Sequence, residues 1–257
     1  MFYGLFEEFT GVFMRIIYFY IQLFIVLIAS SICSASIEPN RSEGEAVNYL
    51  RYIHSRFSLL HGSFNDEYPE QVMSAMFISP DDKVLEIGGN IGRNSCVIAS
   101  LLNDPKNLVV TESDPGAASI LIANRNRNGL FFHVEDSAIS QVPLMQGRGI
   151  TSFQAIVLPS GYFQVKTILY TELKEKYKIS FNVLVADCEG ALYHLFQDDE
   201  SILDDVSMLI LENDYTDKAC YEDVRTKFIT HGFHLVYNKS GGWPPCFNEF
   251  YQVWKKF

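Results

Sequence analysis

The chain has 257 residues, of which 48% are hydrophobic and 20% are charged. These proportions exclude a disordered or low-complexity protein, and the length suffices for one large domain with a continuous hydrophobic core. The formal net charge of −11 argues against nucleic acid as a partner, because sequence-independent binding to a polyanion needs a basic surface. Positions 1–36 hold two acidic residues and one basic residue, so the negative charge belongs to the rest of the chain.

The first 36 residues differ from the rest in composition. No charged residue lies between Ile16 and Ile37, and the run over 16–29 is apolar on every face of a helix, with Gln22 as its one strongly polar residue. With its flanks, such a segment can cross roughly 30 Å of hydrocarbon. It is either a signal anchor or a signal peptide cleaved after the small-x-small sequence C-S-A at 33–35. We predict an N-terminal hydrophobic signal or membrane anchor over 1–36, and a protein that is membrane-anchored or in the secretory pathway.

Residues 37–80 are expected to form a linker and helices that precede the main domain. Ser42 followed by Glu45 has the spacing of a capping box, which predicts the start of an amphipathic helix that continues to Leu60. A second helix is expected over residues 70–78.

Residues 81–257 alternate between short apolar runs and helical stretches. Strands are predicted at 83–87, 107–112, 130–135, 182–187, 206–212, 233–238 and 247–255. Helices are predicted at 92–103, 116–126, 168–177, 190–197 and 219–231. Such alternation, with strands rich in Val, Leu and Ile, is typical of a mostly parallel sheet covered by helices on both faces.

The last two predicted strands are joined by S-G-G-W-P-P at 240–245, which leaves no room for a helix. The last strand should therefore run antiparallel to its neighbours. The predicted fold of residues 81–257 is an α/β Rossmann-like three-layer sandwich, whose mostly parallel seven-stranded sheet ends in a C-terminal antiparallel hairpin. Ligands of such sheets bind beyond the carboxyl ends of the strands, so functional residues are expected at those ends.

The first strand runs into a glycine-rich turn, E-I-G-G-N-I-G at 86–92. Gly88 and Gly92, with Asn90 between them, let the backbone approach a ligand and expose the amides of the following helix. The motif lacks the first glycine of a dinucleotide-binding G-x-G-x-x-G, and it carries Glu86 instead. A carboxylate there would repel a pyrophosphate, but it suits the ammonium and sulfonium groups of S-adenosyl-L-methionine.

The second and third strands also end in polar residues. Glu112 lies 24 residues after Gly88, at a position where a carboxylate can accept hydrogen bonds from both hydroxyls of a ribose. The third strand ends near Asp136 and Ser137, and either residue could donate or accept a hydrogen bond at an adenine ring. Together with the glycine turn, these residues predict an adenosine-containing cofactor.

The fourth predicted strand runs directly into Asp187-x-Glu189-Gly. Two carboxylates beside the expected methyl donor are costly to place together unless they bind or react, which favours a catalytic role for Asp187. Glu189 fits either a catalytic role or a stabilising one at a helix N-terminus. As an alternative, Asp187 with Glu212 and Asn213 of the next strand end could hold a hard metal cation.

Taken together, these motifs resemble the FkbM family of class I S-adenosylmethionine-dependent methyltransferases, over roughly residues 81–238. The shared segments are E-I-G-G-N-I-G at 86–92, T-E-S-D-P at 111–115, N-R-N-R-N at 124–128, V-K-T-I-L at 165–169 and D-C-E-G at 187–190. The family pattern reads D-x-G-A-N-x-G, then E-P, then K-x-D-x-E-G. Glu86 and Gly89 depart mildly from it, and Val185 stands where the family often has lysine.

The resemblance implies a class I methyltransferase fold, S-adenosyl-L-methionine as cofactor and O-methylation of a hydroxyl. The implied acceptor is a small molecule, a glycan or a lipid-linked group. An alcohol must lose its proton when it attacks the methyl group, and Asp187 is the best candidate to position or accept that proton. Glu189, Glu212 and His194 are alternatives.

Two rival functions follow from the same residues. Tyr170 and Lys174 have the Y-x-x-x-K spacing of short-chain dehydrogenases, which raises an NAD(P)-dependent reductase as an alternative. The absent first glycine and the unexplained Glu86 argue against it, and we interpret that pair as chance on an exposed helix. The other rival is a membrane-tethered module of the same fold that binds the cofactor without turnover.

Overall fold

The computed structural model describes residues 39–147, 153–154 and 160–257, so the hydrophobic segment predicted over 1–36 lies outside the described residues. Pro39–Lys256 form one compact unit. Within the described part of the chain, no helix combines the length and the apolar character needed to cross a bilayer.

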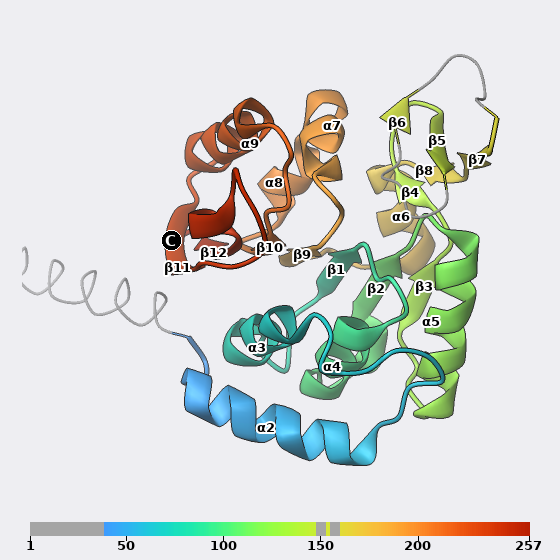
Figure 1. Cartoon of the computed structure of the whole chain (residues 1–257), viewed down its shortest axis with the longest axis vertical. Coiled ribbons are helices and arrows are strands. Elements are labelled where there is room, and N and C mark those ends of the chain that lie inside the picture. The colour runs from blue at the N-terminus through green and yellow to red at the C-terminus, as the bar shows by residue number, and fades with distance from the viewer. Residues whose placement is uncertain (1–38, 148–152, 155–159) are drawn as a thin grey trace, which may run out of the picture. The chain divides into compact units, whose positions relative to one another are not determined.

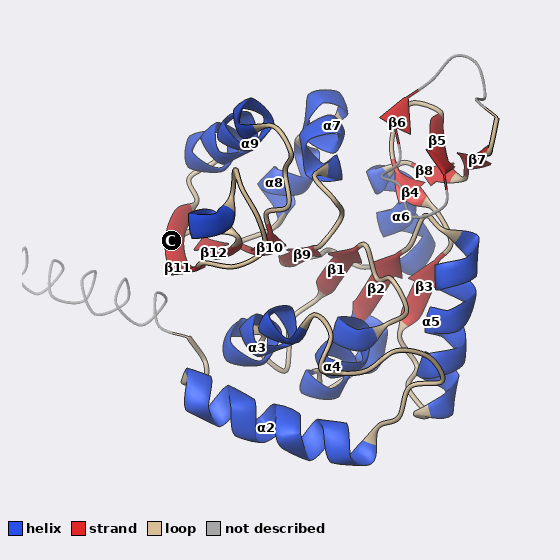
Figure 2. Ribbon diagram, viewed as in Figure 1, coloured by secondary structure: helices blue, strands red, loops and turns tan. Residues whose placement is uncertain are grey.

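The centre of this unit is a seven-stranded sheet in the order β11-β12-β10-β9-β1-β2-β3 (Figures 1 and 2). Neighbouring strands are parallel from β3 to β10, whereas β12 runs antiparallel to both β10 and β11. The predicted sheet and its antiparallel last strand are thereby confirmed. The strands are β1 (Val84–Ile87), β2 (Leu108–Thr111), β3 (His133–Glu135), β9 (Val183–Ala186), β10 (Met208–Glu212), β11 (His234–Lys239) and β12 (Tyr251–Lys255).

Helices cover both faces of the sheet because its strands bury alternate side chains on opposite sides. On β9, Val183 and Val185 pack into one core cluster, and Leu184 and Ala186 pack into the other. The first cluster contains residues of α2 (Glu43–Arg56), α3 (Tyr68–Phe77), α4 (Arg93–Leu101) and α5 (Pro115–Arg127). The second contains residues of α6 (Tyr170–Tyr177), α7 (Ala191–Asp198), α8 (Ser201–Asp205) and α9 (Lys218–Thr230).

Local sequence signals set several of the helix boundaries. Ser42 and Glu45 form the predicted capping box at the start of α2, but the helix ends at Arg56 rather than at Leu60. The last strand begins at Tyr251 instead of residue 247, because a short 3-10 turn occupies Phe247–Glu249.

The sequence predicted no regular elements between residues 136 and 167, but the structure has two small sheets there. β4 (Ala138–Ile139) pairs in parallel with β8 (Thr167–Ile168), and β5 (Leu144–Gly147) pairs antiparallel to β6 (Phe153–Gln154) and β7 (Tyr162–Val165). They lie beyond β3 and next to α6 (Figure 1). Their strands have two to four residues, too few for hydrophobic periodicity to show in the sequence.

Candidate functional site

The register of the central strands brings the predicted site residues to one edge of the sheet. Val185 of β9 is paired with Glu86 of β1 and with Ile210 of β10, so these three side chains share one face. Two residues further along, Asp187 and Glu212 follow on that face at the carboxyl ends of β9 and β10. The predicted strand ends do therefore meet in space.

A cleft of about 730 Å³ opens at this edge. It takes walls from the turn after β1, from the end of β2, from β4 and β5, and from α7. Its size and its mixture of apolar and polar walls suit a cofactor of a few hundred daltons. Of the predicted site residues, the cleft is lined by Gly88, Asn90, Glu112, Ser137, Asp187, Glu189 and His194, and it is not lined by Glu86, Gly92 or Asp136.

The glycine turn brings β1 against the end of β9. Gly88 has a φ of +86°, and a Cβ atom there would lie 1.7 Å from the carbonyl oxygen of Asp187. Only glycine permits both this conformation and this approach. The backbone amides of Gly88 and Gly89 both donate to the carbonyl of Thr111, which fixes the turn beside the end of β2.

Glu112 holds the wall of the cleft at the end of β2. Its side chain is 8% exposed, and its two oxygens accept hydrogen bonds from the backbone amides of Asn90 (2.7 Å) and Asp114 (2.8 Å). Burial raises the pKa of Glu112, and the two backbone donors oppose that rise. The amide of Ser113 provides a third backbone hydrogen bond, and because a carboxylate has about four acceptor sites, this one can still accept from a ligand in the cleft.

Asp136 and Ser137, which the sequence did not separate, differ in the structure. Asp136 forms an ion pair with Lys166 at 2.5 Å and lies away from the cleft. Ser137 lines the cleft and is 3% exposed, and its hydroxyl has no hydrogen-bond partner among the residues that the structure describes. A buried hydroxyl without a partner is unfavourable, so Ser137 is the better placed of the two to bind a polar ligand atom.

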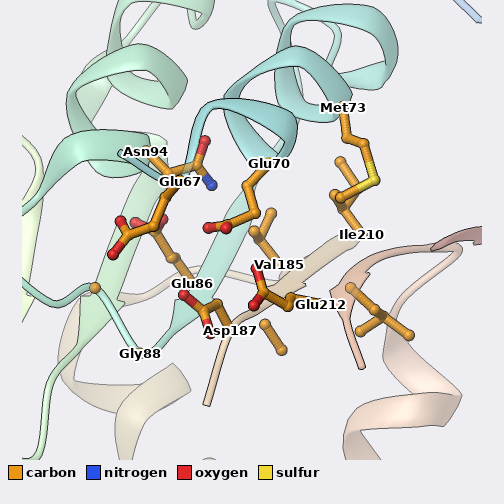
Figure 3. Close-up of a pocket in the computed structure, with 13 residues that line it drawn as sticks. Glu67, Glu70, Met73, Glu86, Gly88, Asn94, Val185, Asp187, Ile210 and Glu212 are labelled. Atoms are coloured by element: carbon orange, nitrogen blue, oxygen red, sulfur yellow. The ribbon is translucent and has the colours of Figure 1, made fainter. Parts of the chain in front are cut away.

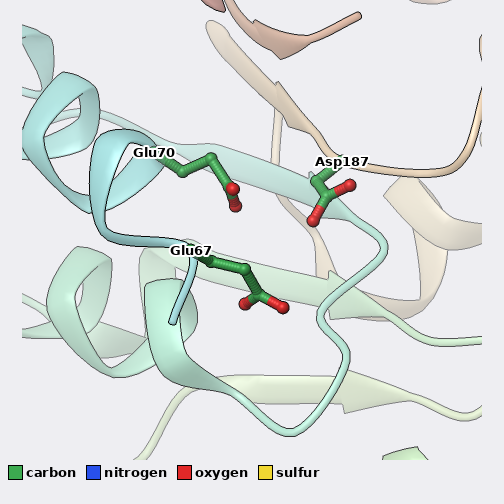
Figure 4. A group of neighbouring side chains, drawn as sticks. All are labelled: Glu67, Glu70 and Asp187. Atoms are coloured by element: carbon green, nitrogen blue, oxygen red, sulfur yellow. The ribbon is translucent and has the colours of Figure 1, made fainter. Parts of the chain in front are cut away.

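Four carboxylates converge beside the cleft, and we call Glu70, Asp187, Glu212 and Asp214 the carboxylate cluster. One oxygen each from Asp187, Glu212 and Asp214 lies within 4.8 Å of the others, and the same holds for Glu67, Glu70 and Asp187. Figures 3 and 4 show Glu70, on α3, directed at Asp187. Asp187 also lines the cleft, so it connects the cluster with the larger site.

Two members of this cluster, Glu70 and Asp214, are not among the residues predicted from the sequence. Glu70 comes from a helix outside the α/β alternation, and only the packing of α3 against β10 brings it here. Asp214 was overlooked in favour of Asn213, whose side-chain nitrogen donates instead to the Glu249 carbonyl (2.7 Å) and to Gln252 (3.1 Å). Asn213 is therefore a structural residue, and the cation set predicted from Asp187, Glu212 and Asn213 is corrected to one with Asp214.

The cluster is strongly acidic and lacks a basic counterpart. Burial, followed by the charge of Asp187, raises the pKa of Glu70, and burial, followed by the charge of Glu212, raises that of Asp187. Burial and the neighbouring Glu189 raise the pKa of Asp214 to about 8. Among the described residues, Arg93 pairs with Asp66 and Glu67 at the margin, and no ion pair reaches the four cluster carboxylates.

Glu86 lies in the same acidic pocket as the cluster rather than in the cleft, and it is 3% exposed. Burial raises its pKa from an ordinary value of 4.5 to about 8, although Ser95 and Asn94 partly oppose the rise. The neutral acid is thus the form that the fold accommodates. Its contribution to stability is complete below pH 4.5 and is lost as the pH rises toward 8.

We expect Glu86→Gln to flatten the pH dependence of stability between pH 5 and 8. The neutral amide replaces a carboxyl group with a raised pKa. That group contributes a slope of about 1.4 kcal/mol per pH unit to the free energy of unfolding. Urea unfolding of the full chain at pH 5, 6, 7 and 8 measures the difference between wild type and variant. The cluster carboxylates titrate in both proteins and cancel in this difference, so equal slopes would contradict the assigned pKa.

No protein-family model and no curated protein matches the chain. Solved structures do match it. The ribosomal protein L11 methylase of Lactobacillus delbrueckii subsp. bulgaricus is 10% identical over 77% of this chain and 82% of its own, with a TM-score of 0.49. An O-methyltransferase from Bacillus cereus, in complex with SAH, is 14% identical over 88% of this chain and 94% of its own, with a TM-score of 0.43.

TrmK of M. capricolum, in complex with S-adenosyl-homocysteine, is 11% identical over 77% of this chain and 68% of its own, with a TM-score of 0.43. These neighbours are methyltransferases by their descriptions, and their TM-scores all lie below 0.5. At such low identity the likeness concerns architecture only. The assignment of the fold rests on the strand order of the sheet.

The residues that raised a reductase as an alternative do not form a site. The Tyr170 hydroxyl and the Lys174 ammonium both bind the carboxylate of Asp205, and neither residue lines the cleft. Tyr170 is also 1% exposed, so the expectation of an exposed helix at this position is wrong for that residue. The pair stabilises the contact between α6 and α8.

Proposed function

We propose that the protein is an S-adenosylmethionine-dependent methyltransferase of the FkbM type, which methylates a hydroxyl of a small molecule, a glycan or a lipid-linked acceptor. The observation that carries the proposal is the position of Glu112. Its carboxylate stands at the end of β2, on the cleft wall, two strand ends away from Asp187. A carboxylate in that position accepts hydrogen bonds from the two hydroxyls of a ribose.

The rest of the cleft fits the same cofactor. Ser137 presents a buried hydroxyl that no described residue binds, which suits a polar edge of adenine, and Gly88 lines the cleft on the side proposed for the methionine part. The acidic surroundings of Asp187 favour a positively charged ligand over a pyrophosphate. When bound, the cofactor would supply a methyl group on a cationic sulfur.

The residues of the chain would then act on the acceptor. A hydroxyl held in line with the methyl group forms an O–C bond as the S–C bond breaks, and its proton passes to a carboxylate. Asp187 is the proposed proton acceptor because it lines the cleft and because its raised pKa increases the proton affinity of its carboxylate. Glu189 lines the cleft next to it and shares a hydrogen bond with Asp214, so we assign it to positioning.

Calorimetry of the full-length chain with S-adenosylmethionine, S-adenosylhomocysteine and NADPH tests the proposal. We expect micromolar binding of the first two and none of NADPH, and the reverse pattern would reject it. Transfer of a radiolabelled methyl group to sugars, glycans, lipid extracts and tRNA then identifies the acceptor class. Cofactor binding without transfer to any of them would favour the non-catalytic module.

We also propose that residues 1–36 tether the domain to a membrane or target it to the secretory pathway. The proposal rests on the uncharged apolar run over 16–37. Protease protection of the full chain in microsomes tests it. Recovery of the full-length chain in the soluble fraction after fractionation would contradict it.

A further inference from the structure

The carboxylate cluster has the geometry of a metal site. A hard divalent cation binds carboxylate oxygens at about 2.1–2.4 Å, so ligands on opposite sides of the ion lie up to about 4.8 Å apart. The oxygens of Asp187, Glu212 and Asp214 all lie within 4.8 Å of one another, and Glu70 lies within the same limit of Asp187. One ion could therefore reach the oxygens of Asp187, Glu212 and Asp214 at bonding distance, whereas Glu70 belongs to the second group, with Glu67 and Asp187.

Two buried oxygens of this cluster have no hydrogen-bond partner within the described part of the chain. Glu70 is 5% exposed and Asp214 is 4% exposed, and neither Oε1 of Glu70 nor Oδ1 of Asp214 receives a hydrogen bond. Figure 3 shows the Glu70 carboxylate directed into the pocket between Asp187 and Glu212. Buried acceptors that are left without a donor or a cation are destabilising, so these oxygens point to a missing ligand.

The other residues that line the pocket indicate that this ligand is a small cation. Its other walls include the apolar side chains of Met73, Val185 and Ile210, which offer no counter-charge. Val185 occupies the position at which the related motif has lysine, so this chain brings the carboxylates together without an ammonium group of its own. An apolar surrounding also strengthens the attraction between carboxylates and a cation.

We propose that Asp187, Glu212 and Asp214 bind one divalent cation of the hard, oxygen-preferring class, such as Mg²⁺, Mn²⁺ or Ca²⁺, and that Glu70, which hydrogen-bonds to Glu212, supports this set from α3. Glu70 makes α3 part of the site, although this helix precedes the α/β domain. The binding of the ion does not depend on methyl transfer. If the proposed function holds, a cation at Asp187 would lower the pKa of both Asp187 and a nearby acceptor hydroxyl, so the proton-acceptor role of Asp187 would apply to the protein without the ion; this consequence rests on that function.

Mn²⁺ binding to the chelator-treated full-length chain, followed by electron paramagnetic resonance, tests the site directly. We expect one tight site in the wild type and an affinity at least about tenfold lower in Glu70→Gln and Asp214→Asn. Val185→Lys is expected to abolish binding because its ammonium would occupy the cluster. Glu86→Gln is the matched control: it changes a buried glutamate of the same pocket that belongs to neither group of converging oxygens, and it should keep the affinity.

Thermal unfolding with and without Mn²⁺ provides a second measurement. The ion should raise the melting temperature of the wild type and of Glu86→Gln, and at the same concentration it should raise that of Glu70→Gln less. Failure of the wild type to bind Mn²⁺, Mg²⁺ or Ca²⁺ would overturn the inference, as would unchanged affinity in both Glu70→Gln and Asp214→Asn. Because calorimetry with S-adenosylmethionine is a separate experiment, loss of the ion site and loss of the proposed function can be told apart.

Discussion

Replacement of Glu112 by alanine is expected to weaken S-adenosylmethionine binding by at least about 100-fold. The carboxylate would form two hydrogen bonds with a ribose, and bonds to a charged group contribute about 1.5–3 kcal/mol each. The variant also frees the amides of Asn90 and Asp114, which loosens the turn beside the cofactor. Calorimetry on the full-length chain measures the loss.

Two further variants separate this role from a general effect of charge. Glu112→Gln keeps one acceptor oxygen, so its affinity should fall between those of the wild type and the alanine variant. Glu135→Gln removes a carboxylate from the neighbouring strand end, where it binds Lys176 and Tyr177 outside the cleft, and it should bind the cofactor normally. Equal affinity in the wild type and in Glu112→Ala would remove the main support for the proposed function.

Asp187→Asn is expected to lower the rate of methyl transfer by a factor of about 10² to 10⁴, the usual contribution of a positioned proton acceptor. An amide of the same shape cannot take the proton of the acceptor hydroxyl. Cofactor affinity should change much less than the rate, because the ribose and adenine contacts come from other residues. Single-turnover transfer and calorimetry on the same preparations give both quantities.

The pH dependence of the methyl-transfer rate provides a second test of the role of Asp187. Burial and the neighbouring Glu212 raise the pKa of Asp187, so the wild-type rate should increase with pH as this carboxyl ionises. Asp187→Asn should lack that increase, whereas Glu222→Gln, which removes a carboxylate of α9 that pairs with Lys218 and Arg225 and does not line the cleft, should retain it. A rate that rises with pH in Asp187→Asn as it does in the wild type would assign the proton to another group.

The strands and their carboxyl ends could be predicted because alternation of apolar runs and helices is a local property of the sequence. Glu112, Asp187 and Glu212 all follow from that alternation, since a carboxylate that directly follows a buried strand must lie at the edge of the sheet. The small sheets of residues 138–168 could not be predicted in this way. Their strands are too short to show a period, and long-range pairing holds them together.

The directions of individual side chains also could not be predicted from the sequence. Glu86 was expected to face the ligand, but the pleat of β1 turns it into the pocket of the carboxylate cluster instead. Asn213 and Asp214 differ for a similar reason: β10 ends at Glu212, and beyond that residue the alternation of sides no longer applies. Glu70 could not be assigned to the site from the sequence, because its position depends on how α3 packs and no local pattern predicts that packing.

Asp187 belongs to the wall of both the cleft and the carboxylate cluster, so the two ligands that we propose would influence each other. A metal ion and a sulfonium are both positive, and each should weaken the binding of the other by the same factor, as thermodynamic linkage requires. The sulfur becomes neutral once the methyl group has left, which removes this repulsion. The ion would therefore disfavour the charged cofactor relative to its neutral product, and the electrostatic energy of the site would favour the transfer.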